Sequence, residues 1–235
     1  MIGAPLFKNI KFKNIKLKSF GQYLAFVVLL CSSALLHAQV GDAGTAESTV
    51  DRTDPYKMVF EVSGDTFDRI KAEKDNIAND PEVLRTIMEE ELLPYINYRF
   101  SAYKVLGKYA SKVEKKELLE FITVFRTYLI STYAVAMGYY DDQEVEFEPA
   151  RDFTDRNDVT VRVSIMDEGR PDIKVAFKVR KDRRSGEWLA YDMIAEGISL
   201  LSSKQSEFEP ILRKQGIQEV ISRMRKSISE PIVID

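Results

Sequence analysis

The chain has 235 residues, of which 45% are hydrophobic and 30% are charged, so it can build one domain or two small ones around a sizeable core. It carries 34 basic and 37 acidic residues, which give a formal net charge of −3 at pH 7. This balance argues against a nucleic-acid partner, because phosphate contacts need clustered Lys and Arg.

The start of the chain differs sharply in composition from the rest. A basic region without acidic residues precedes an apolar run, Tyr23 to Leu36, that is too short to span a bilayer comfortably. A tolerable cleavage site follows and ends at Ala38. We therefore expect residues 1–38 to be a secretory signal peptide that is cleaved on export. An uncleaved signal anchor is the alternative, and the bulky Leu30 argues against a lipoprotein anchor through Cys31.

Cleavage would change the charge of the chain and remove two residue types. Loss of the five lysines between Lys8 and Lys18 from the 34 basic residues leaves 29 against 37 acidic ones, a net charge of −8. Such an acidic product argues against tight adsorption to anionic lipid head groups. The only Cys and the only His, Cys31 and His37, lie in the same segment. We therefore predict a mature chain without a disulfide, a Cys/His zinc site or other metal site, a Cys nucleophile or a Ser-His-Asp triad.

Two helix starts follow a small, polar leader. Residues 39–53 have the composition of a flexible segment. Asp54-Pro55 favours a helix start, with Asp as the N-cap and Pro in the first turn, although the apolar spacing becomes imperfect near Gly64. Asp80-Pro81 favours a second start, and Pro94 ends or kinks that helix. The apolar residues of the two helices are Val59, Val62, Phe67 and Ile70, and then Val83, Leu84, Ile87, Met88 and Leu92.

The centre of the chain is first aromatic and then strongly amphipathic. The segment from Tyr95 to Leu106 is rich in Tyr and Phe. Ser111 and Glu114 have capping-box spacing, and they open the clearest amphipathic helix pattern of the chain, which runs as far as Gly138. From Tyr128 on, the opposite side of this helix is apolar too, so we expect it to be covered on more than one side.

Beyond this helix the apolar period changes to two, which predicts β-strands. Apolar and polar residues alternate through residues 145–147, 159–166 and 173–180, and the bulky run from Trp188 to Ala195 makes a fourth strand. Because the turns between them are short, we predict a four-stranded antiparallel meander with one apolar and one mostly charged face.

The chain ends in two predicted helices. Gly197 breaks the strand pattern, and helical spacing follows from Ile198 to Leu212 and from Ile217 to Met224, with Gly216 between them. The fold class is therefore α+β: N-terminal helices, the sheet, and two C-terminal helices. We expect the helices to pack on the apolar face of the sheet, because the other face is charged.

Two blocks of this sequence resemble one family. AYDMIAEGISLL (residues 190–201) is followed by ILRKQGIQ (residues 211–218), and a second block runs from Glu91 to Ala134. Both are similar to the MlaC family, the periplasmic phospholipid-binding proteins of the Mla lipid transport system. The blocks are spaced as in that family and together cover nearly all of the expected mature chain. The resemblance implies a periplasmic chain with one lipid-binding domain, residues 54–228, and a C-terminal tail, residues 229–235.

The resemblance also implies a function. Members of this family hold phospholipid acyl chains in a hydrophobic pocket between the sheet and the helices. This chain would then shuttle phospholipid between an inner-membrane ABC transporter complex and an outer-membrane lipoprotein with its porin. It would be a monomer without cofactor or enzymatic activity, with bound phospholipid as its cargo. The residues expected to contact lipid are Tyr98, Phe121, Phe125, Tyr128, Tyr133, Val161, Val163, Val175, Phe177, Tyr191, Met193 and Ile198.

Two other functions remain open from the residues themselves. The apolar surfaces of the sheet and helices are also typical of an ordinary closed core, as in a structural interaction domain. A periplasmic hydrolase that uses Asp or Glu is the other alternative, and Asp192, the one acid in its strand, could then act as a general acid or base. A simpler interpretation of Asp192 is a hydrogen-bonded structural acid, paired with Arg99, Arg126 or Arg162.

The remaining charged runs suggest no site. Glu144, Glu146 and Glu148 lie along one strand without a loop that could wrap a calcium ion. The basic runs at residues 112–116 and 181–184 are short and surrounded by acids, as is typical of solvated turns.

Overall fold

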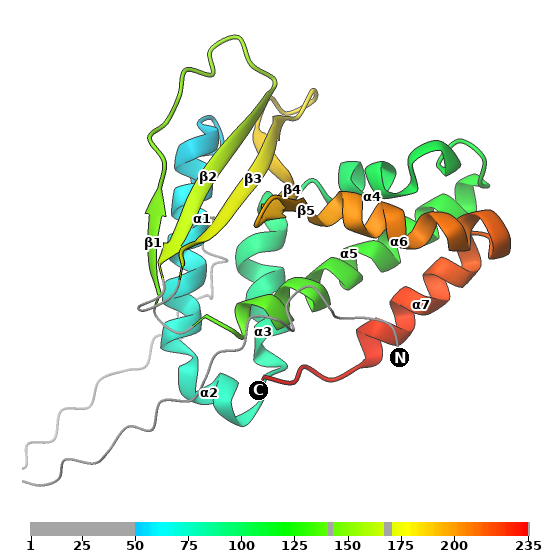
Figure 1. Ribbon diagram of the computed structural model, residues 1–235, viewed down its shortest axis with the longest axis horizontal. Helices are drawn as coiled ribbons and strands as arrows, with labels where there is room; N and C mark the ends of the chain where they lie inside the picture. Colours follow the sequence, from blue (N-terminus) through cyan, green and yellow to red (C-terminus); the bar gives the residue numbers. More distant parts are fainter. Residues whose placement is uncertain (1–49, 141–142, 167–170, 235) are drawn as a thin grey trace, which may run out of the picture. The chain divides into compact units, whose positions relative to one another are not determined.

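The structure is a computed structural model that describes residues 50–140, 143–166 and 171–234. These residues belong to one compact unit that begins at Val50. The predicted signal peptide and the leader as far as residue 49 lie outside the described residues. Figure 1 shows how the helices and strands of the unit are arranged.

The first helix begins where the sequence predicts it. α1 spans Pro55–Ala72, and the Asp54 side chain caps it by accepting hydrogen bonds from the backbone N–H groups of Tyr56 and Lys57 at 2.8 and 3.1 Å. The helix continues through Gly64 without a break. The imperfect apolar spacing near this glycine therefore does not interrupt the helix.

The second predicted helix is divided into several short pieces. α2 (Lys74–Asn79) precedes this helix and was not predicted, and the first piece of the predicted helix is α3 (Val83–Ile87). The chain then widens into a π-helix, η1 (Met88–Leu92), and tightens into a 3-10 turn, η2 (Leu93–Tyr95). Pro94 lies in that turn, where its missing N–H group would interrupt a regular α-helix. These pieces bring the chain to the edge of the sheet.

The long central helix is confirmed, with a correction to its cap. α4 (Tyr98–Leu106) and the 3-10 turn η3 (Gly107–Tyr109) precede α5 (Lys115–Met137). The capping box of α5 is made by Glu114 and Glu117, and not by the predicted pair three residues earlier. α5 is long and apolar enough to cross a membrane by length and composition. α3, α4 and α7 pack around it, however, which is typical of the core helix of a globular domain.

The sheet has five antiparallel strands in the order β1-β2-β3-β4-β5, so the prediction of four strands is wrong by one. The strands are β1 (Glu144–Phe147), β2 (Asp158–Met166), β3 (Ile173–Lys181), β4 (Trp188–Ala195) and β5 (Ile198–Ser199). β5 pairs with the end of β4 across a tight turn at Glu196 and Gly197, which both have positive φ. Two residues are too short for alternation to be visible, which is why the sequence placed Ile198 in a helix.

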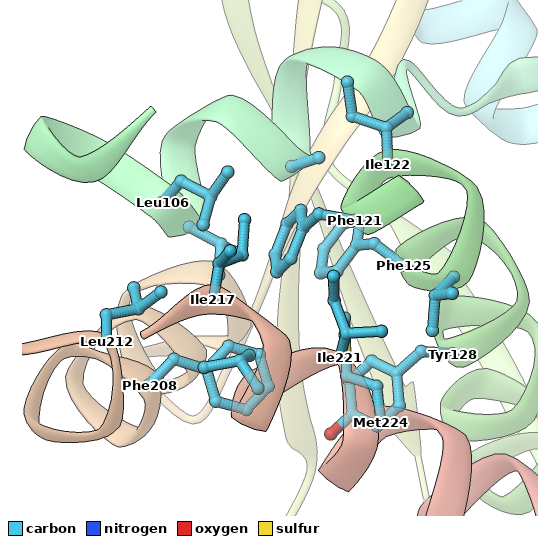
Figure 2. Packing of buried hydrophobic residues seen from close by; sticks show 14 of the residues in the cluster. Leu106, Phe121, Ile122, Phe125, Tyr128, Phe208, Leu212, Ile217, Ile221 and Met224 are labelled. Atoms are coloured by element: carbon cyan, nitrogen blue, oxygen red, sulfur yellow. The ribbon is translucent and has the colours of Figure 1, made fainter. Parts of the chain in front are cut away.

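The two C-terminal helices are confirmed. α6 spans Leu200–Gln215 and α7 spans Ile217–Ser229, and Gly216 joins them with a φ of 81° that favours glycine. Both helices pack with α4 and α5 into a helical core whose centre is shown in Figure 2. This core is separate from the one on the sheet.

The apolar face of the sheet is covered by α1. Met58, Val59 and Val62 of this helix share a buried cluster with Val161 and Val179 of the sheet. α4 and α6 contact the sheet mainly along β4, where the helical core begins. The expectation that helices pack on the apolar face is therefore correct for α1, whereas α4 to α7 pack mainly on one another beside the sheet (Figure 1).

The residues after α7 are packed against the domain. The Ile232 side chain is buried with α3 and α5, and its backbone N–H donates a hydrogen bond to the Glu82 carboxylate at 2.8 Å. Arg85 donates a second bond, to the backbone carbonyl of Glu230, at 2.8 Å. In the segment predicted as a tail, Glu230 and Ile232 therefore contact α3, and Ile232 and Ile234 pack on the apolar cluster around it.

Candidate functional site

A cavity of about 100 Å³ lies between α1, the end of α5, the η2 turn and the inner face of β3 and β4. Its walls are mostly apolar, and among the described residues that line it Asp192 is the one charged side chain. The lining residues from the helices and turns are Met58, Val59, Val62, Ser63, Thr66, Phe67, Leu92, Tyr95, Ile96, Tyr133 and Met137. Those from the sheet are Phe177, Ala190, Tyr191, Asp192 and Met193.

One wall is a stripe along α1. Its lining residues come in neighbouring pairs that repeat every four positions, from Met58 through Val62 to Thr66, as expected for one face of an α-helix. The Thr66 hydroxyl donates to the Val62 carbonyl at 2.6 Å, so its polar atom is satisfied within the helix. The stripe can therefore present a mostly apolar surface to the cavity.

The opposite wall depends on a β-bulge. Lys178 pairs with Asp192 but Val179 pairs with Ala190, so Tyr191 is an extra residue on β4. The bulge breaks the strict alternation of faces, and the four consecutive residues from Ala190 to Met193 all line the cavity.

The start of α4 holds this bulge in place. The backbone N–H of Asn97 donates to the Ala190 carbonyl at 2.7 Å. The Ser101 hydroxyl donates to the Tyr191 carbonyl at 2.6 Å. The two bonds satisfy carbonyl groups that the irregular ladder exposes, so they fix the wall of the cavity.

Asp192 is a structural acid, as the simpler interpretation of the sequence held, but its partners are different. Its side chain is only 6% exposed and accepts hydrogen bonds from the Ser199 hydroxyl at 2.7 Å and the Leu201 backbone N–H at 3.1 Å. Both donors lie at the N-terminus of α6, where the helix dipole favours a negative charge. Two of the three expected arginine partners are close to other acids: Arg126 pairs with Glu89 at 2.7 Å, and Arg162 lies 3.9 Å from Glu148.

Two tyrosines of the cavity are poor acids. Burial raises the pKa of Tyr133 well above its usual range, and the nearby negative charge of Asp192 adds to the effect. Burial, followed by the charge of Asp158, raises the pKa of Tyr191 to about 12. Both hydroxyls are therefore neutral at physiological pH. The cavity wall, among its described residues, also contains no cation that could pair with the Asp192 carboxylate.

Four of the residues predicted to contact lipid line the cavity: Tyr133, Phe177, Tyr191 and Met193. Phe121, Phe125 and Tyr128 instead point into the helical core between α4, α5, α6 and α7 (Figure 2). Tyr98 packs against that core and against a second cluster around α3, and Ile198 is 46% exposed on β5. Val161, Val163 and Val175 are buried on the sheet and are not among the residues that line the cavity.

Sequence reasoning missed the whole α1 wall, because none of the predicted contact residues lies on this helix. The paired spacing of Met58, Val62 and Thr66 was present in the sequence, but Gly64 and the polar Thr66 obscured it. Ile96 and Ala190 carry no local signal, because they enter the wall through the contact between η2 and the bulge. The one clue available in the sequence was that Ser63 and Thr66 lie on the apolar side of the α1 stripe.

The comparisons with known proteins agree on one family. The family model described as MlaC protein matches residues 61–226, which reach from α1 into α7. This chain belongs to the MlaC family. A relative within the MlaC family, the intermembrane phospholipid transport system binding protein MlaC of Haemophilus influenzae, is 34% identical over 189 residues, which are 80% of this chain and 88% of the relative.

A solved structure extends the comparison to the fold. A phospholipid-binding protein from Ralstonia solanacearum, solved in complex with a phospholipid, matches this MlaC-family chain with a TM-score of 0.67 at 20% identity. The match covers 75% of this chain and 97% of the other. The two proteins therefore share their fold.

Proposed function

We propose that this MlaC-family chain is a periplasmic carrier that binds phospholipid with its acyl chains in the cavity between α1, α5 and the sheet. The observation that carries the proposal is an apolar cavity, walled by α1 and the bulged strand β4, in a member of a family whose Haemophilus relative is a phospholipid transport binding protein. Residues 1–38 would be removed on export, and residues 54–228 would form the lipid-binding domain.

The energetics of lipid transfer require such an enclosure. Two acyl chains carry roughly 30 methylene groups, and each costs about 0.8 kcal/mol when it is exposed to water. A carrier must therefore offset a gross cost on the order of 20 kcal/mol by burying both chains. The head group is already well hydrated and can stay outside, so one carrier could accept several head groups.

The volume of the cavity sets a condition on loading. A cavity of about 100 Å³ is smaller than the 300–1,000 Å³ that is typical of small-molecule sites. Two acyl chains would therefore enter only if α1 and the sheet move apart. α1 is suited to such a movement because it ends at short, irregular pieces of helix, whereas α5 is held in the helical core.

The carrier would need partners in both membranes. We propose an inner-membrane ABC lipid transporter complex and an outer-membrane lipoprotein with its porin, and a monomer as the diffusing species.

Chemistry at the cavity is not needed for this role. Asp192 is engaged in two hydrogen bonds that stabilise the start of α6, which favours a structural role over that of a general base.

Mass spectrometry of the purified protein tests the proposal against its alternatives. Bound intact phospholipid would support the carrier, bound lysolipid would support a hydrolase, and a protein without lipid would support a closed interaction domain.

A matched pair of substitutions on α1 tests the cavity itself. Ser63→Glu places a carboxylate in the wall, where acyl chains would desolvate it, so co-purified phospholipid should fall by about tenfold or more. Gly64→Glu adds the same charge one residue later, where an added Cβ has no neighbouring atom within 4 Å, and should leave the lipid content unchanged. Normal lipid content in a folded Ser63→Glu variant would contradict this site. Circular dichroism of both variants separates loss of lipid from loss of fold.

A further inference from the structure

The outward face of α4 combines cations with aromatic rings. Ser101, Ala102 and the two residues at the end of the helix are buried, which leaves Arg99, Tyr103 and Lys104 exposed to solvent. Tyr103 is 47% exposed, a high value for so large a side chain. The sequence from Leu92 to Val113 contains neither Asp nor Glu, although the whole chain is net acidic.

β3 extends this face across the sheet. The Arg180 guanidinium lies 3.7 Å from the centre of the Phe100 ring, and the Lys104 ammonium lies 5.4 Å from the same ring. Tyr191 meets the ring edge-on at 5.1 Å. By strand alternation Lys178 projects from the same side of β3 as Arg180. We call Arg99, Phe100, Tyr103, Lys104, Lys178 and Arg180 the α4–β3 basic surface.

The cations of this surface lack acidic partners within the described part of the chain. None of Arg99, Lys104 and Arg180 lies within ion-pairing distance of a described carboxylate, whereas cations elsewhere, such as Arg126 with Glu89, form close pairs. Asp158 is opposite Arg180 in the strand register, but its carboxylate accepts a hydrogen bond from the Tyr191 hydroxyl at 3.2 Å. The stacked guanidinium of Arg180 keeps donors that can bind a carboxylate in its plane.

We propose that the α4–β3 basic surface is the docking surface for an acidic segment of a partner protein. Arginine and aromatic side chains on rigid elements are enriched at the energetic centres of protein interfaces. The negative charge on the rest of the chain does not oppose docking, because charges are screened beyond about 8 Å at physiological ionic strength. The surface also adjoins the lipid cavity, since Tyr191 contacts Phe100 and lines the cavity wall.

The geometry favours a protein over a membrane as the partner. Membrane adsorption needs apolar side chains that can enter the acyl region, together with cations that bind the head groups. Phe100 cannot serve in this way because Arg180, Lys104 and Tyr191 surround its ring. An acidic segment needs no such insertion, and it would gain charge-assisted hydrogen bonds from the free donors.

Site-directed photo-crosslinking tests the docking surface. The purified protein would carry a photo-crosslinker in place of Tyr103 and would be added to washed membranes of the cells that make it, at low and at high salt. Vesicles made from lipids extracted from the same membranes serve as the protein-free comparison. Arg99→Glu with Lys104→Glu reverses two charges of the surface. Lys214→Glu with Lys226→Glu makes the same change in net charge at exposed cations on α6 and α7.

The expected result is a crosslink to a protein segment with clustered Asp and Glu, which is lost at high salt. It should be about tenfold weaker in the α4 double variant and unchanged in the control variant. Equal crosslinking in the α4 variant, crosslinks to lipid in the protein-free vesicles, or no crosslink at low salt would each overturn the proposal. Co-purified phospholipid, measured on the same variants, should stay normal, so failure of the docking surface and failure of the lipid carrier are distinguishable.

Discussion

Removing the charge of Asp192 should destabilise the fold without affecting lipid chemistry. Its carboxylate accepts two hydrogen bonds at the start of α6, from the Ser199 hydroxyl and the Leu201 backbone N–H. Asp192→Asn keeps one acceptor oxygen for Leu201 but loses the charge, so the free energy of unfolding should fall by about 1–3 kcal/mol. Asp192→Ala leaves both donors without their acceptor and should cost more, on the order of 3–5 kcal/mol.

A double-mutant cycle with Ser199 sharpens this prediction. The Ser199 hydroxyl also caps α6 by accepting from the Ser202 backbone N–H at 3.0 Å, so Ser199→Ala alone should cost about 1–2 kcal/mol. Because the two side chains are in contact, the double variant should deviate from additivity by more than about 0.5 kcal/mol. Urea denaturation followed by circular dichroism measures the free energy of unfolding of the wild type, Asp192→Ala, Ser199→Ala and the double variant.

Two results would refute this reasoning about Asp192. Additive costs within about 0.3 kcal/mol would show that Asp192 and Ser199 do not act as a unit. An Asp192→Asn variant that unfolds like the wild type but no longer processes lipid would instead favour the hydrolase. An Asp192→Asn variant that is less stable yet still carries intact phospholipid is the outcome we expect.

The remaining predictions concern pH and metal. The Ile232 backbone N–H, with a smaller contribution from Arg85, holds the pKa of Glu82 below its ordinary value of 4.5, so this carboxylate stabilises the fold above pH 4.5 and the contribution is lost as the pH falls through the lowered pKa. Thermal melts on either side of pH 4.5 should therefore show a smaller acid-induced loss for Glu82→Gln than for the wild type, and an equal loss would contradict the assignment. Chelator should leave both the melting temperature and the lipid content unchanged, because the described residues contain no group of three or more His, Cys, Asp or Glu placed to hold a metal ion. A large loss of either would point to the acidic β1 strand.

Some features could be predicted from the sequence because their causes are local. Asp54-Pro55 caps α1 through atoms two and three residues away, and the stripe along α5 follows from helical periodicity alone. The strands β2 and β3 were visible because one face meets the core and the other meets solvent. The blocks that resemble the MlaC family identified the family, because similarity between sequences can be recognised without knowing how the chain folds.

The identity of the neighbour on each apolar stripe could not be predicted in this way. Phe121 and Phe125 lie on as clear a stripe as any in the chain, but α7 covers them, so they belong to the helical core. Periodicity states that a face is buried and not what buries it. The predicted contact residues were therefore drawn from the helical core as well as from the cavity wall, because periodicity alone does not separate the two.

By itself, the sequence determined the α+β class, the start of α1, the apolar stripe of α5, the alternation of the strands and the family. Only the tertiary structure decided that a bulge at Tyr191 makes four consecutive residues of β4 line one cavity. It also decided that the hydrogen-bond partners of Asp192 lie at the start of α6 and are not arginines. It alone brought the cations of α4 and β3 around Phe100. The physical reason is that caps and periodic faces depend on neighbours within a few residues, whereas a cavity wall or a charged surface is made by segments that meet only after the chain has folded.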